Sequence, residues 1–142
     1  STADTNVPIY ENLGGLRKGQ GPPYYIQGHL LNRKLGGPGL RFNVTPITTS
    51  ANGNHSNKVE NVIKGWFKAP TKAKAVYYHV KPDGYGNKTT LTPGATKKEK
   101  DAEKRLVNYF SCDAYVLEKK GGKWEKSAKQ PAETIAPQID NK

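Results

Sequence analysis

The stretch GHLLNRKLGGPGLRFNVTPITTSANGNHSNKVEN, residues 28–61, decides the fold of this chain. It follows PYYIQ at 23–27, which is rich in β-forming residues and predicts a strand that ends near His29. The Gly- and Pro-rich LGGPG at 35–39 predicts a turn, and RFNVT at 41–45 predicts a short second strand. The stretch therefore predicts a β-hairpin with His29 near the end of its first strand.

A helix is predicted directly after this hairpin, over residues 51–67, with Ser50 as its N-cap. Its apolar residues recur at three- and four-residue spacings: Val59, Val62, Ile63, Trp66 and Phe67. Asn52 and Glu60 are eight residues apart, a little over two helical turns, so we expect them on nearly the same face. His55 lies near that face too. The pattern predicts a polar stripe beside an apolar one.

The second half of the chain predicts further strands. KAVYYHV at 74–80 alternates like a strand, and KTTLT at 88–92 is its candidate return partner. The charged segment 96–105 predicts one or two helical turns. LVNYFSCDAYVLEKK at 106–120 and KWEKS at 123–127, separated by Gly-Gly, predict a second hairpin.

We therefore expect an α+β fold in a single domain spanning residues 1–142. Its core would be a two-strand and one-helix unit near residues 23–68, extended by β-hairpins. Residues 1–22 predict an irregular arm, and residues 131–142 predict a loosely ordered tail.

Charge points to a polyanionic partner. The chain carries 23 Lys and Arg against 12 Asp and Glu, for a net charge of +11. Such an excess attracts nucleic acid through phosphate contacts and counterion release. Cys112 is the only cysteine, which excludes an intrachain disulfide, and we expect it to be a small buried side chain. The sequence shows no membrane-spanning run and no signal peptide, so we expect no membrane partner.

In residues 24–68, under half of the chain, the sequence resembles the ββα-metal, or His-Me finger, superfamily. The closest likeness is to non-specific DNA/RNA endonucleases, and a looser one is to HNH nucleases. The matching pieces are GH at 28–29, GG at 36–37, FNVTP at 42–46 and ANGNHSNKVE at 51–60. Their order, and the spacing of eight from Asn52 to Glu60, make the resemblance more specific than any one piece.

The resemblance implies a role for each of several residues. His29 would be the general base that takes a proton from water, and Asn52 the ligand of one divalent cation, Mg²⁺ or another such as Mn²⁺. Glu60 would orient metal-bound waters, and Asn43 would tie the second strand to the loop that holds His29. These residue types suit the task, because neutral imidazole accepts protons near pH 7 and Mg²⁺ prefers oxygen ligands.

The chain departs from this family before Gly28, where Ile26 and Gln27 stand in place of an Asp-Arg pair. Another cation must then contact the scissile phosphate, and we rank the candidates as Arg41, Arg33 and Lys34. The missing acid also gives more weight to Asn52, with His55 as a candidate second metal ligand or phosphate contact.

The function expected is magnesium-dependent hydrolysis of phosphodiester bonds in DNA, and also in RNA, leaving 5′-phosphate and 3′-hydroxyl ends. The resemblance extends to toxins that a secretion or injection system delivers into a target cell, for which an acidic immunity protein is a natural partner. Two alternatives stay open. One is a non-catalytic basic nucleic-acid-binding module; the other is a metal-independent ribonuclease that uses His29 and His55 as base and acid.

Overall fold

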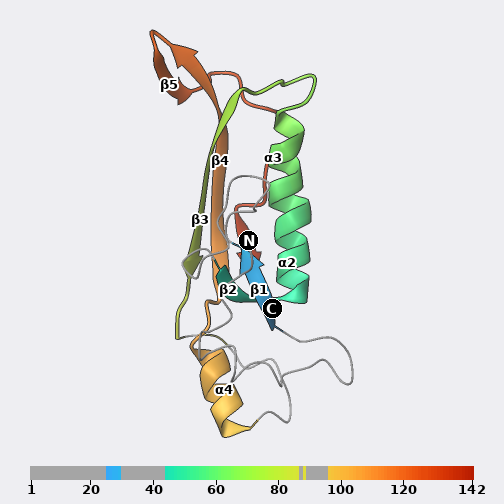
Figure 1. Cartoon of the computed structure of the whole chain (residues 1–142), viewed down its shortest axis with the longest axis vertical. Coiled ribbons are helices and arrows are strands. Elements are labelled where there is room, and N and C mark those ends of the chain that lie inside the picture. Colours follow the sequence, from blue (N-terminus) through green and yellow to red (C-terminus); the bar gives the residue numbers. More distant parts are fainter. Residues whose placement is uncertain (1–24, 30–43, 87, 89–95) are drawn as a thin grey trace.

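The computed structural model describes residues 25–29, 44–86, 88 and 96–142. Its elements, labelled in Figure 1, are β1 (Tyr25–His29), β2 (Val44–Thr48), α2 (Thr49–His55), η3 (Ser56–Glu60), α3 (Asn61–Trp66), β3 (Ala75–Asp83), α4 (Lys97–Lys104), β4 (Tyr109–Lys120), β5 (Lys123–Lys126) and β6 (Gln138–Asp140). Within these residues β1 and β2 form one sheet, and β3, β4, β5 and β6 form another. The fold is mixed α+β, as predicted. The predicted arm at 1–22, the turn at 35–39 and most of KTTLT lie outside the described residues.

The chain passes from the first sheet straight into its longest helical stretch. β1 and β2 are antiparallel, with Tyr25 opposite Thr48 and His29 opposite Val44. The Thr48 side chain accepts a hydrogen bond from the Ala51 amide at 3.0 Å, so Thr48 is the N-cap and the helix begins at Thr49. The prediction of Ser50 as N-cap is wrong, because the Thr48 side chain accepts the hydrogen bond from the amide of Ala51.

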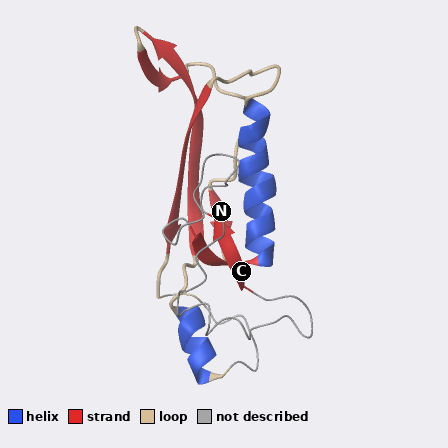
Figure 2. Ribbon diagram, viewed as in Figure 1, coloured by secondary structure: helices blue, strands red, loops and turns tan. Residues whose placement is uncertain are grey.

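One helical stretch, α2 through η3 to α3, covers one side of the long strands (Figure 2). Its middle segment, η3, is a π-turn, in which hydrogen bonds run from residue i to i+5. Four of the five predicted apolar residues are buried: Val59, Val62, Ile63 and Trp66. Phe67 is 44% exposed because α3 ends at Trp66 and Phe67 is its C-cap, so its assignment to the apolar face is wrong.

Strands β3 and β4 are the longest in the structure and pair antiparallel along their length, from Ala75 opposite Leu117 to Asp83 opposite Tyr109. The other edge of β4 pairs with β6 near its start and with β5 near its end. Gly121 and Gly122 connect β4 to β5 with φ angles of 56° and 80°, a backbone typical of two-residue hairpins. The second predicted hairpin is confirmed.

Alternation along β3 and β4 gives the sheet a core face toward the helix. This face carries Val76, Tyr78, Val80, Phe110, Cys112, Ala114 and Val116, all in or against the cluster formed with the helix. Cys112 is buried, as predicted, and burial raises the pKa of its thiol to about 11. The thiol therefore stays protonated at neutral pH.

The helix at 97–104 confirms the prediction for the charged segment 96–105. Thr96 and Glu99 form a capping box, in which each side chain accepts a hydrogen bond from the other residue's amide. Glu103, on the inner side of α4, is fully buried and accepts a hydrogen bond from the Tyr25 hydroxyl at 2.8 Å. This bond joins α4 to the first strand of the small sheet.

The prediction of a loosely ordered tail over 131–142 is wrong. Residues 138–140 form β6, and the side chains of Ile139 and Asn141 are buried. The Asn141 carboxamide donates to the carbonyl oxygens of Pro46 (3.3 Å) and Val107 (3.0 Å). It accepts from the Thr48 amide at 2.9 Å. The tail orders because these buried backbone groups need partners that no local sequence pattern supplies.

We expect Asn141→Asp to lower the free energy of unfolding by roughly 2–6 kcal/mol, because two buried carbonyl oxygens lose their donor at about 1–3 kcal/mol each. Urea denaturation followed by circular dichroism measures the change. Asn61→Asp is the control, since the Asn61 side chain bonds only Asn57 at the surface. A loss below about 0.5 kcal/mol in Asn141→Asp would remove this carboxamide from the forces that hold the tail.

Candidate functional site

The first candidate site lies where β1 meets the start of the helix. A Cβ atom built on Gly28 would lie 2.2 Å from Cγ2 of Ile47 and 3.6 Å from Oδ1 of Asn52. Only glycine fits at this position. The carboxamide oxygen of Asn52 therefore lies beside Gly28, on the side where a Cβ atom would be.

Asn52 is half-buried near the N-terminal end of α2. Its carboxamide makes no hydrogen bond within residues 25–29, 44–86, 88 and 96–142, although its oxygen is close to Gly28. An amide oxygen without a donor fits a hard cation such as Mg²⁺, which takes few protein ligands and keeps several waters. Asn52 is the one predicted ligand whose surroundings in the described structure suit that role.

The other predicted residues near this site are described only in part. His29 is the last residue of β1, and its backbone pairs with Val44. The remaining predicted residues lie outside the described residues, and their roles stay predictions: Arg33, Lys34, Arg41 and Asn43.

A second polar cluster lies on the core side of the helix, facing β3. His55 Nδ1 is 3.3 Å from Glu60 Oε1, with side chains only 5% and 6% exposed. On its other side, His55 Nε2 is 2.6 Å from the Tyr78 hydroxyl. Burial, with smaller contributions from Cys112 and Glu60, raises the pKa of Tyr78 far above its usual value. A hydroxyl that keeps its proton can donate to Nε2, which leaves the Nδ1 proton for Glu60.

The π-turn explains how His55 and Glu60 meet. They are five residues apart, and in a regular α-helix such residues point about 140° away from each other. The i to i+5 hydrogen bonds of η3 widen the turn and bring the two side chains to the same side. The sequence predicts His55 only near the face of Asn52 and Glu60, and its contact with Glu60 comes from this local departure from α-helical geometry.

This cluster changes the roles expected for His55 and Glu60. Both ring nitrogens of His55 are engaged, so none is available to a metal, a phosphate or a substrate proton. Glu60 Oε1 is paired with His55, and Oε2 is buried without a hydrogen bond from any described residue. The prediction of His55 as a metal ligand does not fit this geometry, and Glu60 contacts His55 rather than open solvent.

Tyr78 is the residue of this cluster to which the sequence analysis gave no role. The strand pattern in the sequence could have identified Tyr78, because Tyr78 alternates with Val76 and Val80 on the core face of β3. A tyrosine hydroxyl on a core face needs a polar partner, and His55 is the nearest candidate on the facing helix.

In the described part of the chain, no three His, Cys, Asp or Glu side chains gather closely enough to hold a metal ion. No helix there is long and apolar enough to cross a bilayer. A cation site at the β1–α2 junction would therefore depend on the Asn52 oxygen rather than on a cluster of acids.

Comparison of the chain with family models, with curated proteins and with solved structures finds no match.

Gly28→Ala tests the close packing at the first site. The added methyl group would overlap the Ile47 side chain, so we expect a loss of about 1–3 kcal/mol in the free energy of unfolding. Gly53→Ala is the matched control, because a Cβ there meets nothing within 4 Å and a helical alanine is favoured by up to about 1 kcal/mol. Equal denaturation midpoints for the two variants would contradict the geometry.

Tyr78→Phe tests the second cluster. It leaves His55 Nε2 buried without a partner, so we expect the free energy of unfolding to fall by about 1–3 kcal/mol. Tyr77→Phe, one residue away on the exposed face, should change stability by less than about 0.5 kcal/mol. Thermal denaturation of both variants measures these changes in stability. If both changes are equally small, the Tyr78 hydroxyl contributes nothing to the stability of the fold.

Proposed function

We propose that this protein is a metal-dependent endonuclease that hydrolyses phosphodiester bonds in DNA and RNA. The observation that carries the proposal is the position of Asn52 Oδ1 beside Gly28, the residue directly before His29. An antiparallel strand pair is followed at once by a helix, whose Asn52 oxygen lies beside the strand end and accepts no hydrogen bond from the described residues. This arrangement suits a single-cation nuclease. The net charge of +11 supports a nucleic-acid substrate.

In the proposed reaction, an imidazole nitrogen of His29 takes a proton from a water molecule while the water oxygen bonds to phosphorus. The bond from phosphorus to the 3′ oxygen breaks, and that oxygen leaves with a proton from solvent. The products are a 5′-phosphate and a 3′-hydroxyl. A divalent cation bound at Asn52 would supply positive charge beside the phosphate.

Other residues are assigned supporting roles in this proposal. Arg41, Arg33 or Lys34 would contact the scissile phosphate, and Asn43 would hold the loop that follows β1. Glu60 and His55 act as positioning residues, since their mutual contact fixes the helix one turn beyond Asn52.

The metal-independent ribonuclease gains no support from the described structure. It would need an accessible imidazole at His55, whereas this side chain is 5% exposed and bonded at both nitrogens. The non-catalytic binding module remains the competing function, and the experiment below separates it from the nuclease.

By the same resemblance, we propose that the chain acts as a toxin delivered into a target cell, where an acidic inhibitor would complement its positive charge. This proposal is independent of the chemistry of the site.

The direct test is cleavage of supercoiled plasmid and of RNA at neutral pH, with Mg²⁺ or with EDTA. We expect cleavage in Mg²⁺ only. His29→Ala should reduce the rate by roughly 10²-fold or more, the contribution typical of a general base. Asn52→Ala should reduce it by about 10–100-fold and raise the Mg²⁺ concentration needed for half-maximal rate.

Asn54→Ala is the matched control, because Asn54 is half-buried on the same helix two residues beyond Asn52. It should retain near-normal cleavage, and circular dichroism should show that all three variants fold. Unchanged cleavage by His29→Ala would eliminate the proposed base. Binding that weakens with salt, without cleavage in any divalent metal, would favour the binding module.

A further inference from the structure

The face of the β3–β4–β5 sheet opposite the helix carries exposed aromatic rings. Tyr77 on β3 lies directly across from Tyr115 on β4, and their rings stack with centroids 4.6 Å apart and planes 15° apart. Trp124 on β5, 48% exposed, pairs with Lys119 and so lies on the same face by alternation. Tyr77 itself is 39% exposed.

Two lysines lie over these rings. Lys126 Nζ is 5.0 Å from the centroid of the Tyr115 ring, and Lys119 Nζ is 5.9 Å from that of Trp124. These distances are within the range of cation–π attraction. We call this surface the aromatic–lysine face; it consists of Tyr77, Tyr115, Lys119, Trp124 and Lys126.

Acidic groups are few on this side of the sheet. Asp113, which pairs with His79, lies on this face two residues before Tyr115 on β4. Asp83, at the end of β3, is 3.8 Å from Lys81. Glu118 and Glu125 alternate to the opposite face, and Glu118 is paired with Lys120 at 3.1 Å. The five residues of the aromatic–lysine face therefore present rings and positive charge, with the carboxylate of Asp113 at their border.

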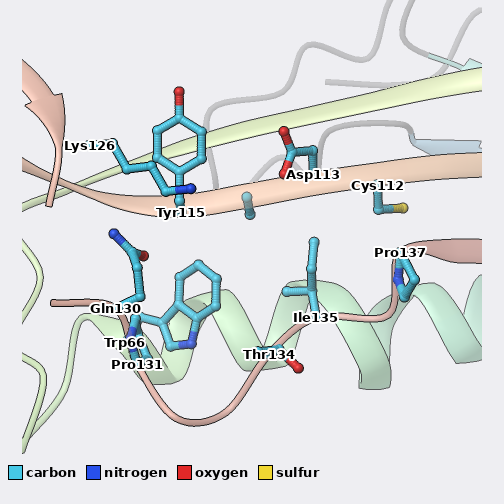
Figure 3. A pocket seen from close by; sticks show the side chains of 11 residues that line it. Trp66, Cys112, Asp113, Tyr115, Lys126, Gln130, Pro131, Thr134, Ile135 and Pro137 are labelled. Atoms are coloured by element: carbon cyan, nitrogen blue, oxygen red, sulfur yellow. The ribbon is translucent and has the colours of Figure 1, made fainter. Parts of the chain in front are cut away.

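Figure 3 shows the edge of this face at β4. Tyr115 and Lys126 project on the side of the strand away from the helix, while Trp66 lies on the helix side. Both Tyr115 and Lys126 also line a cavity of about 290 Å³ that runs beside β4 to Gln130. Rings and cations thus border a hollow as well as an open sheet surface.

We propose that the aromatic–lysine face binds a single-stranded segment of nucleic acid, with bases stacked on Trp124 and on the Tyr77–Tyr115 pair. Unpaired bases expose flat rings that stack on aromatic side chains, while lysines neutralise the phosphates that follow them. A duplex keeps its bases stacked inside and offers these rings nothing comparable. The inference rests on the proposed function for the choice of nucleic acid, and adds a binding surface on the far side of the sheet from Asn52.

The two tryptophans make this face directly observable. Trp66 is 5% exposed and Trp124 is 48% exposed, so an added ligand that stacks on the surface should quench Trp124. The probe is a 12-nucleotide oligo(dT), titrated into the full chain in EDTA, which prevents metal-dependent cleavage. We expect saturable quenching that weakens as salt increases.

Variants then assign the binding to this face. Tyr77→Ala, followed by fluorescence titration, should weaken oligo(dT) binding by about tenfold, and Trp124→Phe should keep the affinity while losing the quenching. Lys126→Ala should weaken binding more than Lys123→Ala, which removes the same charge from the other face of the same hairpin. Circular dichroism confirms that each variant folds.

Several results would overturn the inference: no binding of oligo(dT) at low salt, equal affinity in Tyr77→Ala, or equal effects of the two lysine changes. Equal quenching by a 12-base-pair duplex, or by heparin, a polyanion without bases, would also overturn it in favour of general polyanion binding. None of these results depends on cleavage. A chain that binds oligo(dT) as expected but cleaves nothing would refute the proposed nuclease and keep the aromatic–lysine face.

Discussion

The position of the small sheet and the helix start relative to the large sheet depends on one buried carboxamide, that of Asn141. It accepts from the Thr48 amide and donates to the carbonyl oxygens of Pro46 and Val107. These bonds join three segments that are distant in the sequence: the β2–α2 junction, the segment before β4 and the C-terminal tail that carries Asn141. Each of these polar groups is buried, so leaving it without a hydrogen-bond partner would destabilise the folded state. Only one arrangement of the three segments satisfies all of the groups together.

A second polar constraint acts on the same helix from the core side. His55 bonds both Glu60 and Tyr78, and the helix adopts a π-turn that brings the first two together. This geometry has a cost, because Glu60 Oε2 is buried without a hydrogen bond from the described residues. The contacts of His55 with Glu60 and Tyr78 also fix the rotation of the helix about its axis relative to β3. The orientation of Asn52 toward Gly28 follows from both constraints, since Asn52 lies between Thr48 and His55.

Local patterns predicted much of the fold. The apolar spacing from Val59 to Trp66 predicted a buried helical face, and the Gly-Gly between β4 and β5 predicted a hairpin. Of the predicted site residues, Asn52 lies beside Gly28, whereas His55 and Glu60 are buried against Tyr78. The roles of the predicted site residues stay predictions. Helical periodicity could not show the contact of His55 with Glu60, because it assumes a constant turn, and a π-turn shifts the direction of every residue beyond it.

By itself, the sequence determined the alternation of the strands, the capping of α4, the apolar stripe of the helix and the basic charge. Each follows from chemistry within a few neighbouring residues. Only the tertiary structure decided that the tail containing Asn141 is ordered, that Asn52 lies against Gly28, and that rings from separate strands share one exposed face. The physical reason is that these features require partners far apart in the chain, and a buried polar group or a cross-strand ring finds its partner only when the elements have packed.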